Sequence, residues 1–229
     1  MRERAFRTEA DLCAAFLKWV GRTRPDVRAY AEWDGWDILL VFPDGRQLGI
    51  QAKLHLNAHV VLQALPTDYG FGYDLAGPDY RGILVPDSRQ QMGEIASKLG
   101  PVEFSHRYGD SFHPKLEPWT DWLDWNHPKR HTLPPTTTDA IAGSPCPVTL
   151  TPWKIAALDV LAEIAVRGSI TTKRMRALHV NPSRWLTACW LLPGEKRGDW
   201  IRGDRCPRFD EQHPSAYALA LEKAREVAA

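Results

Sequence analysis

Three polar side chains interrupt two hydrophobic, strand-like runs in the first quarter of this 229-residue chain. Asp37 stands at the start of one run, and Gln51 and Lys53 stand in the next, beyond a Pro43–Arg46 turn. Side chains alternate along a strand, so Gln51 and Lys53 point to the same side of a sheet. Asp37 and Gln51 can each give an oxygen to Mg²⁺, and Lys53 can orient a water or stabilise developing negative charge. The spacing therefore predicts a metal-dependent site for phosphodiester hydrolysis.

The same hairpin also has a purely structural interpretation. Asp37 can cap a strand, while Gln51 and Lys53 face solvent on an edge strand, where Lys discourages aggregation. The buried face of the second strand would then consist of Leu48, Ile50, Ala52 and Leu54. This buried face is compatible with both interpretations, because an active-site face also lies opposite an apolar one.

The segments around the hairpin predict a mixed α/β domain over residues 1–125. Thr8 is expected to cap a helix that Gly21 ends, since apolar residues repeat at helical spacing between them. Hydrophobic periodicity then predicts strands over 27–33, 36–42, 47–54 and 81–86, with helices over 58–65 and 88–99. Residues 68–79 are expected to form a loop. The order is a helix, a three-stranded meander, a helix, a strand and a helix.

Two short motifs in this order resemble a known nuclease family. Asp34-Gly-Trp-Asp37 followed by Ile50-Gln-Ala-Lys53 resembles the PD-(D/E)xK superfamily, and within it the Mrr-type restriction endonucleases, which carry Gln-x-Lys in place of Glu-x-Lys. The resemblance covers roughly residues 5–100. It implies a restriction-endonuclease-like core and a DNA endonuclease that uses Mg²⁺ or Mn²⁺. Asp37 would be a metal ligand, Gln51 the second-ligand position, Lys53 the catalytic lysine and Glu9 an accessory acid.

The chain departs from this family pattern at Trp36, and Gln51 weakens the implied metal site. Trp36 stands where the family has a small or aliphatic residue, and Gln51 is a neutral ligand that binds Mg²⁺ less well than Glu would. The alternative to an enzyme is therefore a catalytically inactive protein that keeps the nuclease fold and has a DNA-binding or regulatory role. A protein–protein adaptor built around the Trp-rich segment is a third interpretation.

The C-terminal part of the chain is basic. Residues 151–229 carry 13 Lys and Arg against 9 Asp and Glu, whereas residues 1–150 carry 16 against 19. Such an asymmetry indicates that the C-terminal part meets a polyanion. Between the two parts, the prolines of residues 126–150 predict an extended linker.

The pattern of residues 151–229 is typical of a winged helix-turn-helix domain. Helices are expected over 153–166, 173–178, 182–192 and 215–227, with a basic hairpin over 194–203. Pro182 opens the candidate recognition helix at the position that tolerates proline best. A small helical dimerisation module is the alternative. The residues expected to contact DNA phosphates are Arg174, Arg176, Arg184, Lys196 and Arg197.

The rest of the sequence mainly excludes classes of protein. Trp119, Trp122 and Trp125 recur every third residue and predict a packing stripe, with a base-stacking platform as the alternative. No apolar run is long enough to cross a membrane, and the N-terminus lacks the apolar core of a signal peptide. The four cysteines lack Cys-x-x-Cys spacing. We therefore expect a reduced, cytoplasmic protein with DNA and not a membrane as partner, and a homodimer is left open.

Overall fold

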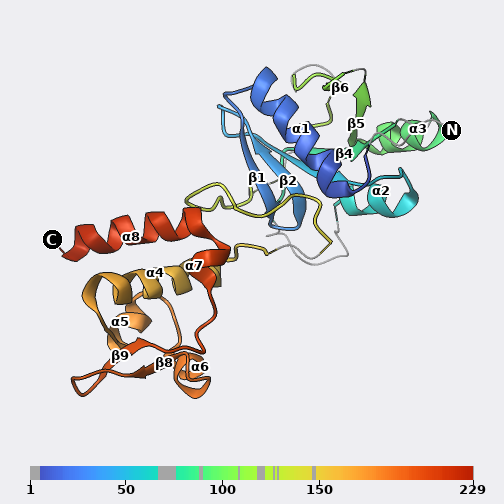
Figure 1. Ribbon diagram of the computed structural model, residues 1–229. Helices are drawn as coiled ribbons and strands as arrows, with labels where there is room; N and C mark the ends of the chain where they lie inside the picture. The colour runs from blue at the N-terminus through green and yellow to red at the C-terminus, as the bar shows by residue number, and fades with distance from the viewer. Residues whose placement is uncertain are drawn as a thin grey trace. The chain divides into compact units, whose positions relative to one another are not determined.

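The chain folds into two compact units (Figure 1). The computed structural model describes residues 6–66, 76–87, 90–107, 109–117, 122–125, 127, 129–145 and 148–228. Unit 1 consists of Met1–Leu133 and Ala140–Pro147, and unit 2 of Pro134–Asp139 and Val148–Ala229. The proline-rich segment that we expected to be an extended linker therefore contributes residues to both units.

Unit 1 is built on a six-stranded mixed sheet in the order β1-β2-β3-β4-β5-β6. The strands are β1 (Arg28–Trp33), β2 (Trp36–Val41), β3 (Gln47–Ala52), β4 (Tyr80–Val85), β5 (Val102–Arg107) and β6 (Ser111–His113). The pairs β1–β2, β2–β3 and β5–β6 are antiparallel, whereas β3–β4 and β4–β5 are parallel. The strands predicted from the hydrophobic pattern are confirmed to within two residues. Strands β5 and β6 were not predicted.

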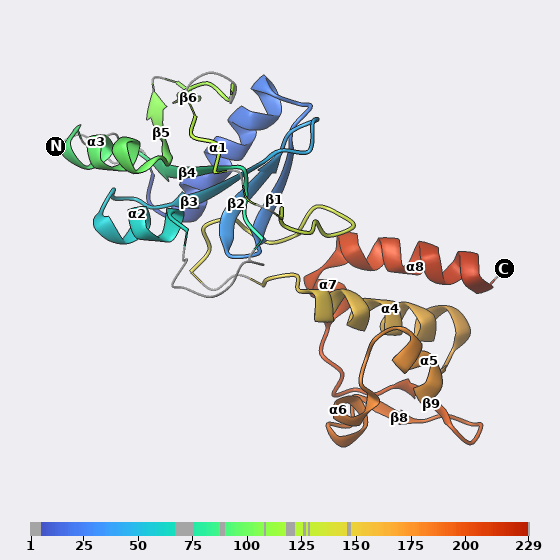
Figure 2. The ribbon, with the colours of Figure 1, turned by 180° about the vertical axis from the view of Figure 1, so that it is seen from behind.

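Helices cover both faces of this sheet (Figure 1 and Figure 2). They are α1 (Glu9–Thr23), α2 (Ala58–Ala64) and α3 (Gln90–Leu99). Leu12 and Phe16 of α1 pack on the face of the sheet that holds Leu84, whereas α2 and α3 pack on the face that holds Ile83. Because successive strand residues face opposite ways, one buried strand such as β4 supplies both layers of the core.

Two predictions about unit 1 are wrong for identifiable reasons. Helix α1 continues through Gly21 to Thr23 and is capped by Arg24, whose N–H donates to the Val20 carbonyl. Pro25 ends the helix instead, because the residue that precedes a proline disfavours the helical backbone conformation. The edge-strand interpretation of the hairpin is also wrong, since β3 lies between β2 and β4.

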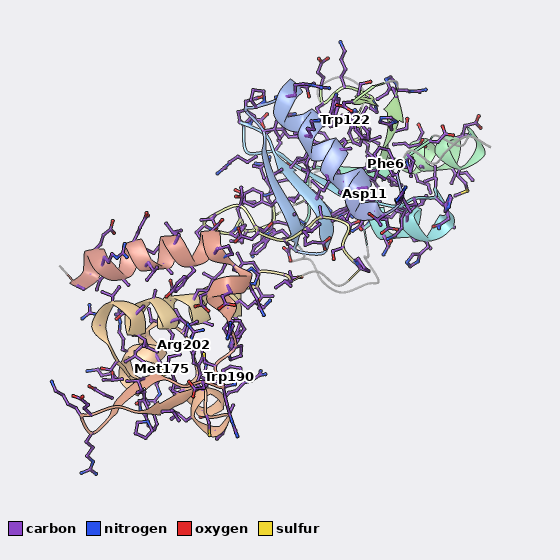
Figure 3. The ribbon with its side chains drawn as sticks, viewed as in Figure 1. Phe6, Asp11, Trp122, Met175, Trp190 and Arg202 are labelled. Carbon is purple, nitrogen blue, oxygen red and sulfur yellow. The ribbon has the colours of Figure 1, made fainter. Side chains whose placement is uncertain are left out.

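The tryptophans after residue 117 belong to the packing of unit 1. Trp122 meets the rings of Tyr80 and Phe104 edge-on, with centroids 5.7 and 5.6 Å away (Figure 3). Trp125 lies 5.4 Å from the guanidinium carbon of Arg81. Trp119 lies outside the described residues. These contacts agree with a packing stripe rather than with a surface platform.

Unit 2 combines helices with a three-stranded antiparallel sheet in the order β7-β9-β8. Its helices are α4 (Pro152–Arg167), α5 (Thr172–Ala177), α6 (Pro182–Thr187), α7 (Phe209–Gln212) and α8 (Pro214–Ala228), and its strands are β7 (Ile170–Thr171), β8 (Leu191–Pro193) and β9 (Asp199–Arg202). Thr151 caps α4, which ends at Gly168 with a left-handed φ of 81°. Helices α4 and α8 pack together, and the closing helix is confirmed to within one residue.

The candidate recognition helix is shorter than predicted. We expected a helix over 182–192, but α6 ends at Thr187. The chain reverses at Cys189, whose φ is 54°, and the Trp190 carbonyl accepts the Gly203 N–H at 2.8 Å. Leu191 therefore belongs to β8 and not to the helix, because backbone groups that form sheet hydrogen bonds cannot also form helical ones.

A pair of glycine substitutions tests the packing of unit 1. A Cβ on Gly49 would lie 2.4 Å from a ring carbon of Trp36, whereas a Cβ on Gly21 meets nothing within 4 Å. We expect Gly49→Ala to lower the free energy of unfolding by about 1–3 kcal/mol through overpacking. Gly21→Ala should raise it by about 0.5–1 kcal/mol, because alanine is the better helix residue. Denaturant unfolding measures both, and equal effects of the two substitutions would contradict this packing.

Candidate functional site

Asp37 lies at one end of the two central antiparallel strands. Ile38 pairs with Ile50, so Asp37 at the start of β2 stands opposite Gln51 at the end of β3. One carboxylate oxygen, Oδ2, accepts the N–H of Ala52 at 2.7 Å. Burial raises the pKa of Asp37, and the charge of Glu9 adds to the rise, while the Ala52 N–H and Lys53 oppose it. This carboxylate is therefore held in a position where a neighbouring cation would relieve an energetic cost.

Gln51 is buried beside Asp37, with 8% of its surface exposed. Its Nε2 donates to the Gly35 carbonyl at 2.7 Å. This hydrogen bond ties the end of β3 to the turn that precedes Asp37. Because the amide nitrogen is used in this way, the remaining polar atom of the side chain is Oε1, which is the atom that a hard cation would bind.

Lys53 follows the end of β3 and pairs with Glu9 on α1. The distance between Lys53 Nζ and Glu9 Oε2 is 2.8 Å, and the two side chains are 28% and 31% exposed. The N–H of Lys53 donates to the Leu84 carbonyl at 2.9 Å, which continues the parallel ladder and fixes the lysine backbone. Thr8 and Asp11 form a capping box at the start of α1, so Glu9 sits in a fixed first turn that favours negative charge.

Glu32 is a third carboxylate of this region. It belongs to β1, has a left-handed φ of 50°, and accepts the N–H of Gly143 at 2.7 Å through Oε1. Burial raises the pKa of Glu32, and the nearby charge of Asp37 raises it further. From the sequence, Glu32 is only a further acid that could complete the metal site beside Glu9, since it stands outside the two motifs. The only signal was a carboxylate in an otherwise strand-like run.

Asp34 and His131 form a further contact that the sequence did not predict. His131 Nδ1 lies 2.5 Å from Asp34 Oδ2, and Trp36 Nε1 donates to His131 Nε2 at 3.1 Å. Because the indole N–H has to meet a lone pair, the proton of the neutral imidazole lies on Nδ1, toward Asp34. Gln47 adds two hydrogen bonds to the backbone of His131. This network fixes the turn of the Asp34–Asp37 motif from a segment almost a hundred residues away.

The donor atoms in this region suit a hard cation only in part. Among the residues that the structure describes, no three His, Cys, Asp or Glu side chains are arranged to hold a metal ion. Mg²⁺ does not need such a cage, because it keeps several waters and takes one or two protein carboxylates. A half-buried carboxylate with a raised pKa, opposite a buried glutamine on the neighbouring strand, meets this smaller requirement.

The five candidate phosphate-binding residues of unit 2 fall into two groups. Arg174 donates through Nε to Glu163 at 3.1 Å, and Arg184 stacks over the rings of Trp153 and Trp190 at 5.8 and 5.2 Å. Those two arginines therefore have structural contacts; Figure 3 labels Trp190 in this cluster. The members of the second group are exposed: Arg176 on α5, and Lys196 and Arg197 in the turn between β8 and β9.

Comparisons with known proteins give no family for this chain: no family model, no curated protein and no solved structure matches it. No helix in the described parts of the chain is long and apolar enough to cross a membrane.

Replacing Asp37 with asparagine tests whether the half-buried charge lowers stability. The pKa of Asp37 is raised in the folded protein, so ionisation of this group favours the unfolded state. The cost begins as the pH rises above the ordinary pKa and is fully present above the raised one. Asn is neutral and can still accept the Ala52 N–H. We expect Asp37→Asn to raise Tm at pH 7 by on the order of 2–4 °C. The gain should shrink as the pH falls toward the ordinary pKa of 3.8, and thermal unfolding across this range measures it. A lower Tm at pH 7 would contradict the account.

Proposed function

We propose that this protein is a Mg²⁺- or Mn²⁺-dependent DNA endonuclease, with a restriction-endonuclease-like core in unit 1 and a winged-helix-like DNA-binding domain in unit 2. The observation that carries the proposal is the meeting of four side chains at one end of the central strands. These are Glu9, Asp37, Gln51 and Lys53, joined by the 2.8 Å ion pair and by the backbone of Ala52.

The topology of unit 1 supports a restriction-endonuclease-like core. Helix α1 precedes an antiparallel β1–β3 meander, and α2 then leads to β4, which is parallel to β3. This is the order that the family resemblance implies. It brings the start of β2, the end of β3 and the first turn of α1 to the same place, as the two motifs require.

Each side chain of the proposed site has a separate task. Asp37 and Gln51 would hold the cation, which when bound neutralises charge on the phosphoryl group and makes a water nucleophilic at neutral pH. Lys53 would stabilise the negative charge that develops on the phosphate oxygens. Glu9 holds the Lys53 ammonium in place at 2.8 Å, so the lysine is oriented before substrate arrives.

The topology of unit 2 supports a winged-helix-like domain. Helices α4, α5 and α6 are followed by the β8–β9 hairpin, whose connecting turn carries Lys196 and Arg197. A three-stranded sheet favours this assignment over a purely helical dimerisation module. The β8–β9 hairpin would be the wing of such a domain, and its exposed cations would contact DNA phosphates. Phosphate contacts position a protein on DNA without reading its sequence.

A second function is favoured by one observation. Within β2 and β3, Asp37 alone carries a carboxylate, and its partner Gln51 is neutral and hydrogen-bonded to Gly35. A nuclease fold of this kind can serve as a DNA-binding scaffold without cleaving. The experiment that follows separates the two functions.

Cleavage of supercoiled plasmid with Mg²⁺ or Mn²⁺ tests the enzyme directly. We expect the unchanged protein to nick or linearise the plasmid, and Lys53→Ala to reduce the rate by roughly 100-fold or more, as expected for loss of a group that stabilises transition-state charge. Lys18→Ala is the matched control. Lys18 lies on α1 and, like Lys53, is paired with an acid, but its partner is Asp110 and its side chain is 73% exposed. DNA that is retarded on a gel but not cleaved by the unchanged protein would favour the scaffold.

DNA affinity at several salt concentrations tests unit 2. We expect the double substitution Lys196→Ala and Arg197→Ala to weaken binding and to reduce the slope of log K against log salt by about 2, one for each lost phosphate contact. Arg208→Ala is the control, because this exposed arginine is already paired with Glu211 at 3.0 Å. The same slope in all three proteins would exclude the wing from the interface.

A further inference from the structure

The segment Ala140–Pro145 lies against the proposed site and is held there by Glu32. The N–H of Gly143 donates to Glu32 Oε1 at 2.7 Å. The segment turns on itself, since the Ser144 N–H donates to the Ile141 carbonyl at 3.2 Å. Ala142 is buried in the same core as α1. We name residues 140–145 the strap.

The strap touches the helix turn that carries Glu9. A Cβ built on Gly143 would lie 2.9 Å from the carbonyl carbon and oxygen of Glu9 and 2.9 Å from Cys13 Sγ. Such a close approach is possible only for glycine, and its φ of 71° is also the left-handed conformation that glycine tolerates. The backbone of the strap therefore supports the first turn of α1 from outside.

These contacts connect Glu32 to Lys53 in three steps. Glu32 holds the strap, the strap packs on the backbone of Glu9, and Glu9 binds Lys53 Nζ at 2.8 Å. We infer that Glu32 is a positioning residue, which acts through the strap and Glu9 to fix the Lys53 ammonium. The inference rests on the proposed function, because it assigns the lysine a task in cleavage.

The hydrogen bond, rather than the charge, is the feature of Glu32 that this role requires. Glutamine keeps an oxygen that accepts the Gly143 N–H, whereas alanine does not. If Glu32 instead held the cation or a water by its charge, glutamine would fail as alanine does. The pair Glu32→Gln and Glu32→Ala therefore separates positioning from direct participation.

The experiment measures kcat and KM for plasmid cleavage in both Glu32 variants and in Gly143→Ala. We expect kcat to fall by ~100-fold in Glu32→Ala and Gly143→Ala, as a displacement of about 1 Å in a catalytic group can cause, with KM for DNA little changed. Glu32→Gln should retain a kcat close to that of the unchanged protein. Gly45→Ala is the matched control, because Gly45 has a φ of 83° but its added Cβ meets only an arginine nitrogen at 3.7 Å.

Amide hydrogen exchange gives a measure that does not depend on cleavage. The Gly143 amide should exchange at least tenfold faster in Glu32→Ala than in Glu32→Gln, since only glutamine preserves its acceptor. The Gly45 amide, which donates to the Phe42 carbonyl at 2.9 Å, is the internal reference and should be unchanged. Equal exchange of Gly143 in the two Glu32 variants would overturn the inference, even where Gly143→Ala fails to fold.

The remaining outcomes distinguish the inference from the proposed function. If Lys53→Ala is inactive but Glu32→Ala and Gly143→Ala cleave like Gly45→Ala, the positioning role of Glu32 is wrong and the nuclease assignment is supported. If Glu32→Gln is as inactive as Glu32→Ala, Glu32 acts by its charge and not by positioning. If the unchanged protein cleaves no better than Asp37→Ala, the nuclease assignment fails and this inference fails with it.

Discussion

The partial burial of the Asp37 carboxylate among other charged groups is the constraint on which the proposed site in unit 1 depends. Burial raises the pKa of Asp37, and the charge of Glu9 raises it further. A folded protein tolerates such a group only when its surroundings compensate the charge, and here the Ala52 N–H donates to it at 2.7 Å and the charge of Lys53 opposes the rise of its pKa. Functional sites characteristically contain groups of this kind, which reduce stability and gain a chemical task in return.

The arrangement of the sheet explains how the charged groups meet. Antiparallel pairing of β2 with β3 brings the start of one strand to the end of the other, so residues 37 and 51 become neighbours. Parallel pairing of β3 with β4 covers the other side of β3 and makes it a central strand. The first turn of α1 then supplies Glu9. The site is therefore a consequence of strand direction and helix placement, and no long loop is needed to build it.

Much of this could be predicted from the sequence, because the signals are local. The alternation of apolar residues predicts β3 and the burial of Leu48, Ile50 and Ala52, but both faces of β3 are buried and Leu54 lies beyond it. The cap at Thr8 predicts the start of α1. The lengths of α1 and α6 were mispredicted, since a proline and a left-handed Cys189 set their ends. Strands β5 and β6 were missed because their polar residues give a weak periodic signal.

The contacts that close the site could not be predicted, because they join distant parts of the chain. His131 reaches Asp34, and the Gly143 N–H reaches Glu32, across 97 and 111 residues. Both come from a proline-rich segment whose composition indicates a linker. Composition describes what a segment can do alone, whereas these backbone groups find their partners only on a folded surface.

Direct titration of Mn²⁺ by calorimetry, into the unchanged protein and into Asp37→Asn, tests the central claim that Asp37 forms a cation site. We expect saturable binding to the unchanged protein and its loss in Asp37→Asn, because the remaining Gln51 oxygen is neutral. Equal binding by both proteins, or binding by neither, would contradict the proposal that the half-buried Asp37 carboxylate holds a metal ion.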